Sequence, residues 1–118
     1  MTPTIQNTIN IINSNISHAV LQITKSGKDA ISKKTALKLQ DLVNSEEIKA
    51  LPENDQLDVL DRVSDLVKEL QTPTTDTGKV HGGLKRLGGF VSSKVSKTMT
   101  QFVAQAAIAF ATANGLKF

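Results

Sequence analysis

Two histidines are the side chains in this sequence best suited to acid–base chemistry or metal binding, and neither has the neighbours that such chemistry requires. His18 lies among apolar residues, and His81 lies in a glycine-rich stretch far along the chain. A zinc site needs several Cys, His or carboxylate ligands at set spacings. The sequence has no cysteine and no acid at such a spacing from either histidine. We therefore expect no catalytic residue, no metal ligand and no cofactor.

Other residues that could do chemistry also lack their context. Ser92, Ser93 and Ser96 alternate with lysines, without the strand, turn and helix of a nucleophile elbow. Gly78-Lys79 lacks the glycine spacing and the following hydroxyl of a phosphate-binding loop. The carboxylates between 58 and 69 are predicted to line an exposed helix face, so perturbed acid–base behaviour is not expected. We expect a protein that is not an enzyme, and no pattern indicates a small-molecule substrate.

Length and composition favour a single domain over residues 1–118. The chain has 39% hydrophobic and 21% charged residues, which is typical of a globular protein. It has four Phe and neither Trp nor Tyr, so the core must be built from Ile, Leu, Val and Ala. The absence of cysteine excludes disulfides and fits a cytoplasmic protein. The first residues lack the basic region and cleavage site of a signal peptide, so we expect the mature chain to start at Met1.

Charge is sorted into blocks along the chain. Residues 1–24 carry no charged side chain, and residues 77–118 carry six basic residues and no acid. Ten of the eleven acids lie between them, in residues 41–76. Uncharged apolar ends around an acidic segment are typical of packing and association rather than catalysis.

The first segment is predicted to be a helix from Pro3 to Thr24, with Thr2 as its cap. Its apolar residues recur every three or four positions, on one face: Ile5, Ile9, Ile12, Ile16, Ala19 and Ile23. The other faces carry Asn, Gln and Ser in place of charges. Three interpretations are open: a core helix, a self-association interface through Ile5, Ile9, Ile12, Ile16 and Ile23, or a β-forming segment.

Two further helical segments follow the break at Gly27. The pattern predicts a helix from Asp29 to Val43, with a cluster of lysines that is either a solvated face or a contact for phosphate or an acidic partner. Asn44 to Glu47 fits a capping box that opens a short helical turn through Ala50.

The best-defined helix runs from Glu53 to Gln71, with a broad stripe of Leu and Val. Its other side carries Asp58, Asp61, Asp65 and Glu69, whose like charges repel at four-residue spacing. Only Asp58 with Arg62, and Asp65 with Lys68, are expected to offset this repulsion. We expect the basic C-terminal segment of the same chain to face these acids; an external basic partner is the alternative.

Residues 71–89 are predicted to be an internal Pro/Gly-rich linker and hinge. Five of the seven glycines lie here, and they bracket Leu84-Lys85-Arg86-Leu87. Glycine adopts positive φ without steric cost, so the linker is expected to let the last helix change its angle.

The last helix is predicted from Phe90 to Asn114, stopped by Gly115. Its apolar positions, either core or partner-binding, include Val95, Met99, Phe102, Ala106 and Phe110. Residues 99–113 would span about 22 Å as a helix, short of the roughly 30 Å of a bilayer core. We expect a tightly packed helix that is buried in the core, in a partner or in lipid.

Several features together form a distinctive layout: an acidic Leu-patterned helix from Leu57 to Leu70, Pro73, the Gly82 to Gly89 hinge, and an Ala-rich helix closed by Gly115-Leu116. This layout resembles small helical effector or adaptor domains of bacterial conflict systems, over roughly half the chain. The resemblance implies a bacterial or phage origin and a role in association or membrane perturbation. It transfers no functional residues.

We therefore expect an all-α bundle of four main helices with one short extra helical turn. The predicted function is a non-enzymatic interaction and self-assembly module, whose partner is a second copy or another protein. The charged contact faces are expected at Asp58, Asp61, Asp65, Glu69, Lys85, Arg86, Lys94 and Lys97. One alternative is a membrane-active effector whose basic C-terminal helix enters anionic lipid. A second is a small nucleic-acid-binding regulator, which the few basic residues and the acidic helix disfavour.

Overall fold

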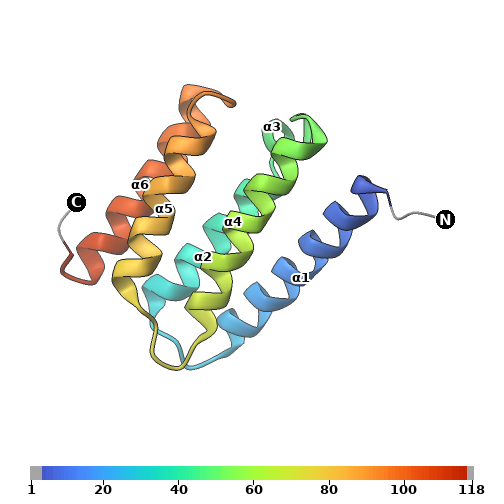
Figure 1. Cartoon of the computed structure of the whole chain (residues 1–118). Coiled ribbons are helices and arrows are strands. Elements are labelled where there is room, and N and C mark those ends of the chain that lie inside the picture. Colours follow the sequence, from blue (N-terminus) through green and yellow to red (C-terminus); the bar gives the residue numbers. More distant parts are fainter. Residues whose placement is uncertain (1–3, 117–118) are drawn as a thin grey trace.

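Six helices and no strand form in residues 4–116, the part of the chain that the computed structural model describes (Figure 1). They are α1 (Ile5–Lys25), α2 (Ala30–Val43), α3 (Glu46–Lys49), α4 (Glu53–Gln71), α5 (Thr77–Val91) and α6 (Lys97–Ala113). The all-α prediction is confirmed, and α3 is the expected short extra turn. The prediction of four main helices is wrong, because the segment predicted as a linker forms a helix of its own.

Short polar side chains start most of these helices. Thr4 accepts a hydrogen bond from the Asn7 N–H at 3.1 Å, at the start of α1. The cap predicted at Thr2, with Pro3, lies outside the described residues. Ser45 caps α3 by accepting from the Ile48 N–H at 3.3 Å, so the predicted capping box from Asn44 to Glu47 is wrong by one residue.

The helices form two layers (Figure 1). α4 lies between α1 and α5 in the front layer, while α2 and α6 pack behind them. The molecule measures 47 × 30 × 19 Å along its principal axes, and the shortest dimension matches two helices in thickness. α2 contacts α1, α4 and α6, so it joins the two halves of the bundle.

The core is aliphatic, as the composition predicts. Every described helix contributes to it, and the largest fully buried side chain is Phe110. Leu116 turns back onto the core behind Gly115, the one residue with positive φ (68°) among those described. Its N–H donates to the Ala111 carbonyl at 2.8 Å, which confirms the predicted stop of the last helix.

The predicted linker over residues 71–89 is wrong from Thr77 onward, where α5 begins. Glycine costs a helix up to about 1 kcal/mol per site relative to alanine. Burial of a Val or Leu side chain contributes roughly 1.5–3 kcal/mol. α5 buries four of them completely, at spacings of four, three and four: Val80, Leu84, Leu87 and Val91. This burial outweighs the glycine cost, and only residues 72–76 connect α4 to α5.

The predicted last helix, from Phe90 to Asn114, is correspondingly two elements. α5 ends at Val91, and α6 begins at Lys97 after a tight turn. Ser96 caps α6 by accepting from the Met99 N–H at 3.2 Å.

Candidate interaction faces

On the acidic side of α4, carboxylates near both ends of the helix form ion pairs, while those in the middle do not. Asp55, in the first turn, forms an ion pair with Lys94 at 3.4 Å. Glu69, in the last turn, forms one with Lys79 of α5 at 3.3 Å. Between them Asp58, Asp61 and Asp65 are exposed, and none makes an ion pair within the described residues. Of the four acids predicted to face the basic C-terminal segment, Glu69 alone forms an ion pair with it in the described residues; the other ion pair uses Asp55, which is not one of the four.

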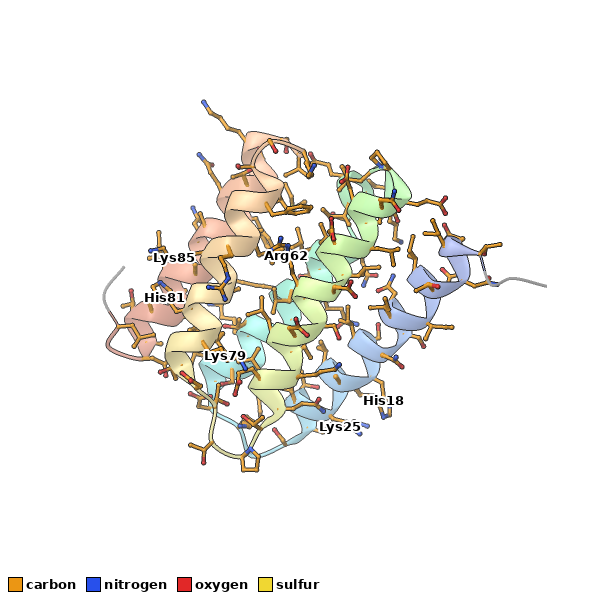
Figure 2. All side chains as sticks on the ribbon, viewed as in Figure 1. His18, Lys25, Arg62, Lys79, His81 and Lys85 are labelled. Atoms are coloured by element: carbon orange, nitrogen blue, oxygen red, sulfur yellow. The ribbon has the colours of Figure 1, made fainter. Side chains whose placement is uncertain are left out.

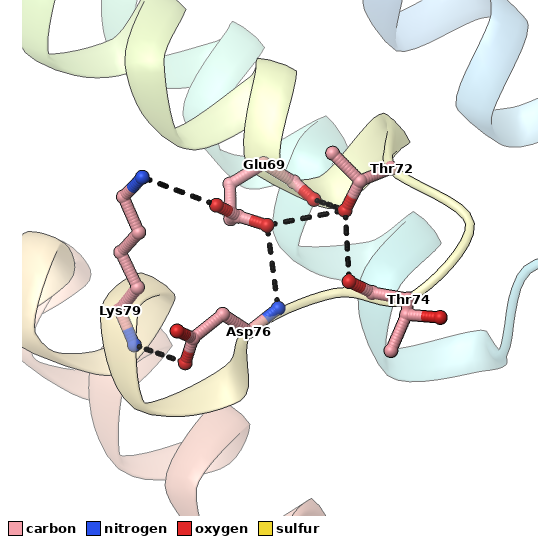
Figure 3. Close-up of polar contacts among 5 residues, drawn as sticks. All are labelled: Glu69, Thr72, Thr74, Asp76 and Lys79. Carbon is pink, nitrogen blue, oxygen red and sulfur yellow. Dashed lines mark hydrogen bonds and ion pairs between the residues drawn. The ribbon is translucent and has the colours of Figure 1, made fainter.

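Glu69 is the best-connected carboxylate in the described part of the chain (Figure 3). Its Oε2 accepts from the Asp76 N–H at 3.3 Å and from the Thr72 hydroxyl at 3.1 Å, while its Oε1 meets the Lys79 ammonium. The Asp76 N–H and the Thr72 hydroxyl, with Lys79, hold the pKa of Glu69 below its ordinary value. This carboxylate joins the end of α4 to the start of α5.

Arg62 does not offset the acids in the way the sequence predicts. Neither the Asp58–Arg62 nor the Asp65–Lys68 ion pair forms in the described residues. The Arg62 guanidinium lies over the Phe90 ring of α5, 4.6 Å from its centroid, and the Lys94 ammonium lies 5.0 Å from the same centroid. A cation over an aromatic face is attracted by the ring quadrupole. The aromatic ring thus draws Arg62 toward α5.

Basic side chains gather along the seam between α4 and α5. Arg62, Lys79 and Arg86 line a groove of about 180 Å³, together with Asp65, Glu69, Leu66 and Gly83. All three cations are exposed (Figure 2 labels Arg62 and Lys79). We call Lys79 and Arg86 of α5 the basic row, and Asp58, Asp61 and Asp65 of α4 the acidic row; Arg62 lies on α4, among the acids. Asp65 lines the groove with both cations of the basic row, so the two rows meet there.

The other predicted contact residues are dispersed. Lys85 lies at the outer edge of α5 (Figure 2), Lys97 opens α6, and both are exposed. Among the predicted lysines near Gly27, Lys28 is bonded to the α4–α5 connection: its ammonium donates to the Thr72 carbonyl and, at 3.1 Å, to the Thr75 hydroxyl.

The isoleucine stripe of α1 faces the core of its own chain. Ile9, Ile16 and Ile23 are buried, with at most 4% of their surface exposed, and Ile12 is half-buried. Ile5 is 42% exposed at the start of the helix. The predicted self-association interface through this stripe is therefore wrong for the folded chain, because α2 and α4 already cover the stripe.

The apolar positions predicted for the last helix also serve the core. Ala106 and Phe110 are buried, and Val95, Met99 and Phe102 are half-buried against the core; Val95 lies in the turn before α6. None of the helices in residues 4–116 has the length and apolar character needed to cross a membrane.

The histidines occupy different environments. His18 is exposed, and its Nε2 lies 3.1 Å from the Gln22 side-chain amide. His81 is only 8% exposed, and its Nε2 has no hydrogen-bond partner in the described structure. No group of three or more His, Asp or Glu that could hold a metal occurs in the described residues.

Sequence reasoning missed a pocket beside His81. It lies between α5 and α6 and has a volume of about 300 Å³. Small residues of both helices, among them Gly88, Gly89, Ala104 and Ala107, leave this space. The clustered glycines are the sequence signal for this space, although by composition they predict a linker.

No protein-family model matches this chain, and comparisons with curated proteins and with solved structures give no significant match. The layout resemblance to small helical effector or adaptor domains stays a prediction.

Proposed function

We propose that this chain is a non-enzymatic interaction module that self-associates through the face formed by α4 and α5. One observation carries the proposal: Asp58, Asp61 and Asp65 lie exposed and without ion pairs within the described structure, and Asp65 lines the same groove as the exposed cations Lys79 and Arg86. Like charges at three- and four-residue spacing destabilise a helix by a few tenths of a kcal/mol per pair. A basic surface placed on this row relieves that repulsion.

A second copy of the chain provides such a surface. The acidic row belongs to α4 and the basic row to α5, and these two helices lie side by side in the front layer (Figure 1). A two-fold axis between α4 and α5, parallel to both, places the acidic row of each copy on the basic row of the other. Such an isologous contact uses the same patch twice and closes as a dimer.

The proposed dimer is weak and sensitive to salt. Exposed ion pairs contribute about 0.2–1 kcal/mol each, and complementary charge adds more to orientation and association rate than to affinity. The face is mainly polar, with the half-buried Phe90 as its aromatic residue. We expect a dissociation constant on the order of 100 μM at low salt, equivalent to about −5.5 kcal/mol.

Sedimentation velocity at low and high salt tests the proposal. The wild-type chain should be partly dimeric at about 100–500 μM and about 20 mM salt, and monomeric near 1 M, where the Debye length falls to about 3 Å. Asp61→Arg with Asp65→Arg makes the face mainly basic, and Arg86→Glu makes it more acidic. Each variant alone should be monomeric, because each face then repels its copy.

Mixing the two variants should restore association, since a basic face then meets an acidic one. Asp41→Lys with Lys34→Glu, on the outer side of α2, is the matched control and should leave the dimer unchanged. A wild-type chain that is monomeric at low salt would contradict the proposal. So would association that survives the charge reversal of Asp61 and Asp65.

A further inference from the structure

The pocket between α5 and α6 has the size and chemistry of a small ligand site. Its volume of about 300 Å³ is at the lower end of the range for ligand pockets, and about twice that of an engineered apolar cavity that binds benzene. Most of its lining is apolar, from Leu84, Gly88, Gly89, Ala104, Ala107 and Ile108. A ligand of eight or so carbons fits this space.

Three polar side chains complete the lining: His81, Lys85 and Thr100. Lys85 is exposed and makes no ion pair in the described structure. Every acid of the chain lies before residue 77, so the sequences of α5 and α6 place only basic charges near the pocket. The charge at its edge therefore favours an anion.

His81 adds an independent observation. Its Nε2 is buried without a hydrogen-bond partner in the described structure, although most buried polar atoms have one and a missing partner destabilises the fold. An imidazole that carries its proton on Nε2 donates to an oxygen acceptor. His81 lines the pocket, and a turn of its ring about the Cβ–Cγ bond, a torsion that is broad for histidine, would be needed to bring Nε2 to a ligand oxygen there.

We propose that this pocket binds a small amphipathic carboxylate, with its apolar part between α5 and α6 and its carboxylate held by His81 and Lys85. The glycines supply the room. A Cβ at Gly89 would meet no atom within 4 Å, and one at Gly88 would make only an ordinary contact with Val103, at 3.7 Å. The lack of side chains at these two positions is thus not required by the packing of α5 on α6, and it leaves the pocket open.

The site is separate from the proposed dimer face, since it lies between α5 and α6 rather than between α4 and α5. Lys85 takes no part in the basic row. Failure of the carboxylate site therefore leaves the proposed self-association standing, and the reverse also holds.

Titration with sodium octanoate, followed by ¹H–¹⁵N chemical shifts of the full chain, tests the site. We expect saturable shifts confined to residues of α5 and α6 that line the pocket, with a dissociation constant on the order of 0.1–1 mM for a ligand of this size. Butyrate keeps the carboxylate but has a shorter apolar chain, and octanol keeps the chain but has no charge. Each should bind at least about tenfold more weakly than octanoate.

Three variants separate ligand binding from folding. Gly89→Leu fills the pocket from an open position and should abolish octanoate binding while the fold is retained. His81→Leu removes the unpartnered nitrogen, so it should weaken binding about tenfold and leave stability equal or higher. Lys85→Met should weaken binding roughly two- to fivefold, as expected for an exposed ion pair.

Specific outcomes would overturn the proposal. Absence of saturable shifts with octanoate at millimolar concentration would do so. Octanol binding as tightly as octanoate would remove the role of His81 and Lys85. Unchanged octanoate affinity in Gly89→Leu would place the ligand elsewhere.

Discussion

Gly83 of α5 lies directly against Leu66 of α4, so closely that a Cβ at position 83 would come within 2.5 Å of the Leu66 Cδ2 atom. Leu66 is 5% exposed and part of the core, so its side chain has little freedom to move. This close approach explains a glycine in the middle of a helix. It also sets the separation of α4 and α5, and with it the geometry of the two charged rows.

Replacing Gly83 with alanine should therefore destabilise the fold. Overpacking typically costs about 1–3 kcal/mol of stability. The better helix propensity of alanine offsets up to about 1 kcal/mol of that cost. We expect a net loss of about 1–2 kcal/mol in urea unfolding. Gly89→Ala is the matched control, because its Cβ meets open space, and it should gain up to about 1 kcal/mol. In a Leu66→Ala background the Gly83→Ala cost should vanish; an equal cost there would exclude the Leu66 contact as its cause.

Ser96 links the start of α6 to α3. Its hydroxyl caps the Met99 N–H, and the hydroxyl and N–H of Ser96 both donate to the Glu47 carboxylate, at 2.8 and 2.7 Å. Ser96→Ala removes the cap and one of the Glu47 bonds, so it should cost about 1–2 kcal/mol in thermal or urea unfolding. Ser93→Ala, at an exposed serine with no hydrogen bond among the described residues, should change stability by less than about 0.5 kcal/mol. Equal effects of the two changes would show that the link between α3 and α6 adds nothing.

The isoleucines of α1 give a direct test of core against interface. Ile16 is 1% exposed and Ile11 is 60% exposed on the same helix. Ile16→Ala should cost about 2–5 kcal/mol, and Ile11→Ala less than about 0.5. Because Ile16 packs within its own chain, its cost should not vary with protein concentration. A cost that grows on dilution would instead place Ile16 between chains.

Glu69 should make stability depend on acid pH. Its pKa in the folded chain is lowered from the ordinary value of 4.5, first by the Asp76 N–H and then by the Thr72 hydroxyl. The unfolded chain then binds the proton at a higher pH than the folded chain, so stability rises with pH across this interval. The contribution is fully present above pH 4.5 and is lost as the pH falls through the lowered folded pKa.

Urea midpoints of wild type and Glu69→Gln, measured from pH 7 to pH 2.5, check this sign. The variant should be less stable at pH 7, and the difference should shrink in acid. Asp41→Asn, at an exposed acid with no hydrogen bond or ion pair among the described residues, is the control and should show a smaller difference at pH 7. A Glu69→Gln difference that stays constant with pH would show that the carboxylate charge plays no part.

The bounds of α1, α2 and α4, and the aliphatic core, could be predicted from the local sequence pattern. The isoleucine spacing in α1 and the Leu/Val spacing in α4 record which face of each helix is buried. They do not record what covers that face. The same isoleucine stripe suits a core and an interface between chains, and only the packing of α2 and α4 on α1 decided between them.

Tertiary structure alone decided α5, the position of Arg62 and the pocket beside His81. Glycine lowers helix propensity locally, while the burial of Val80, Leu84, Leu87 and Val91 against other helices is a larger, nonlocal term. Arg62 is four residues from Asp58 in sequence, yet Phe90, brought alongside by the packing of α5 on α4, is its partner. A pocket formed by the small residues of two helices exists only once those helices are packed together. Local periodicity therefore predicts a helix such as α1 or α4 and its buried side, where the residues also favour a helix. The formation of α5 and the contacts between distant residues depend on how the helices pack.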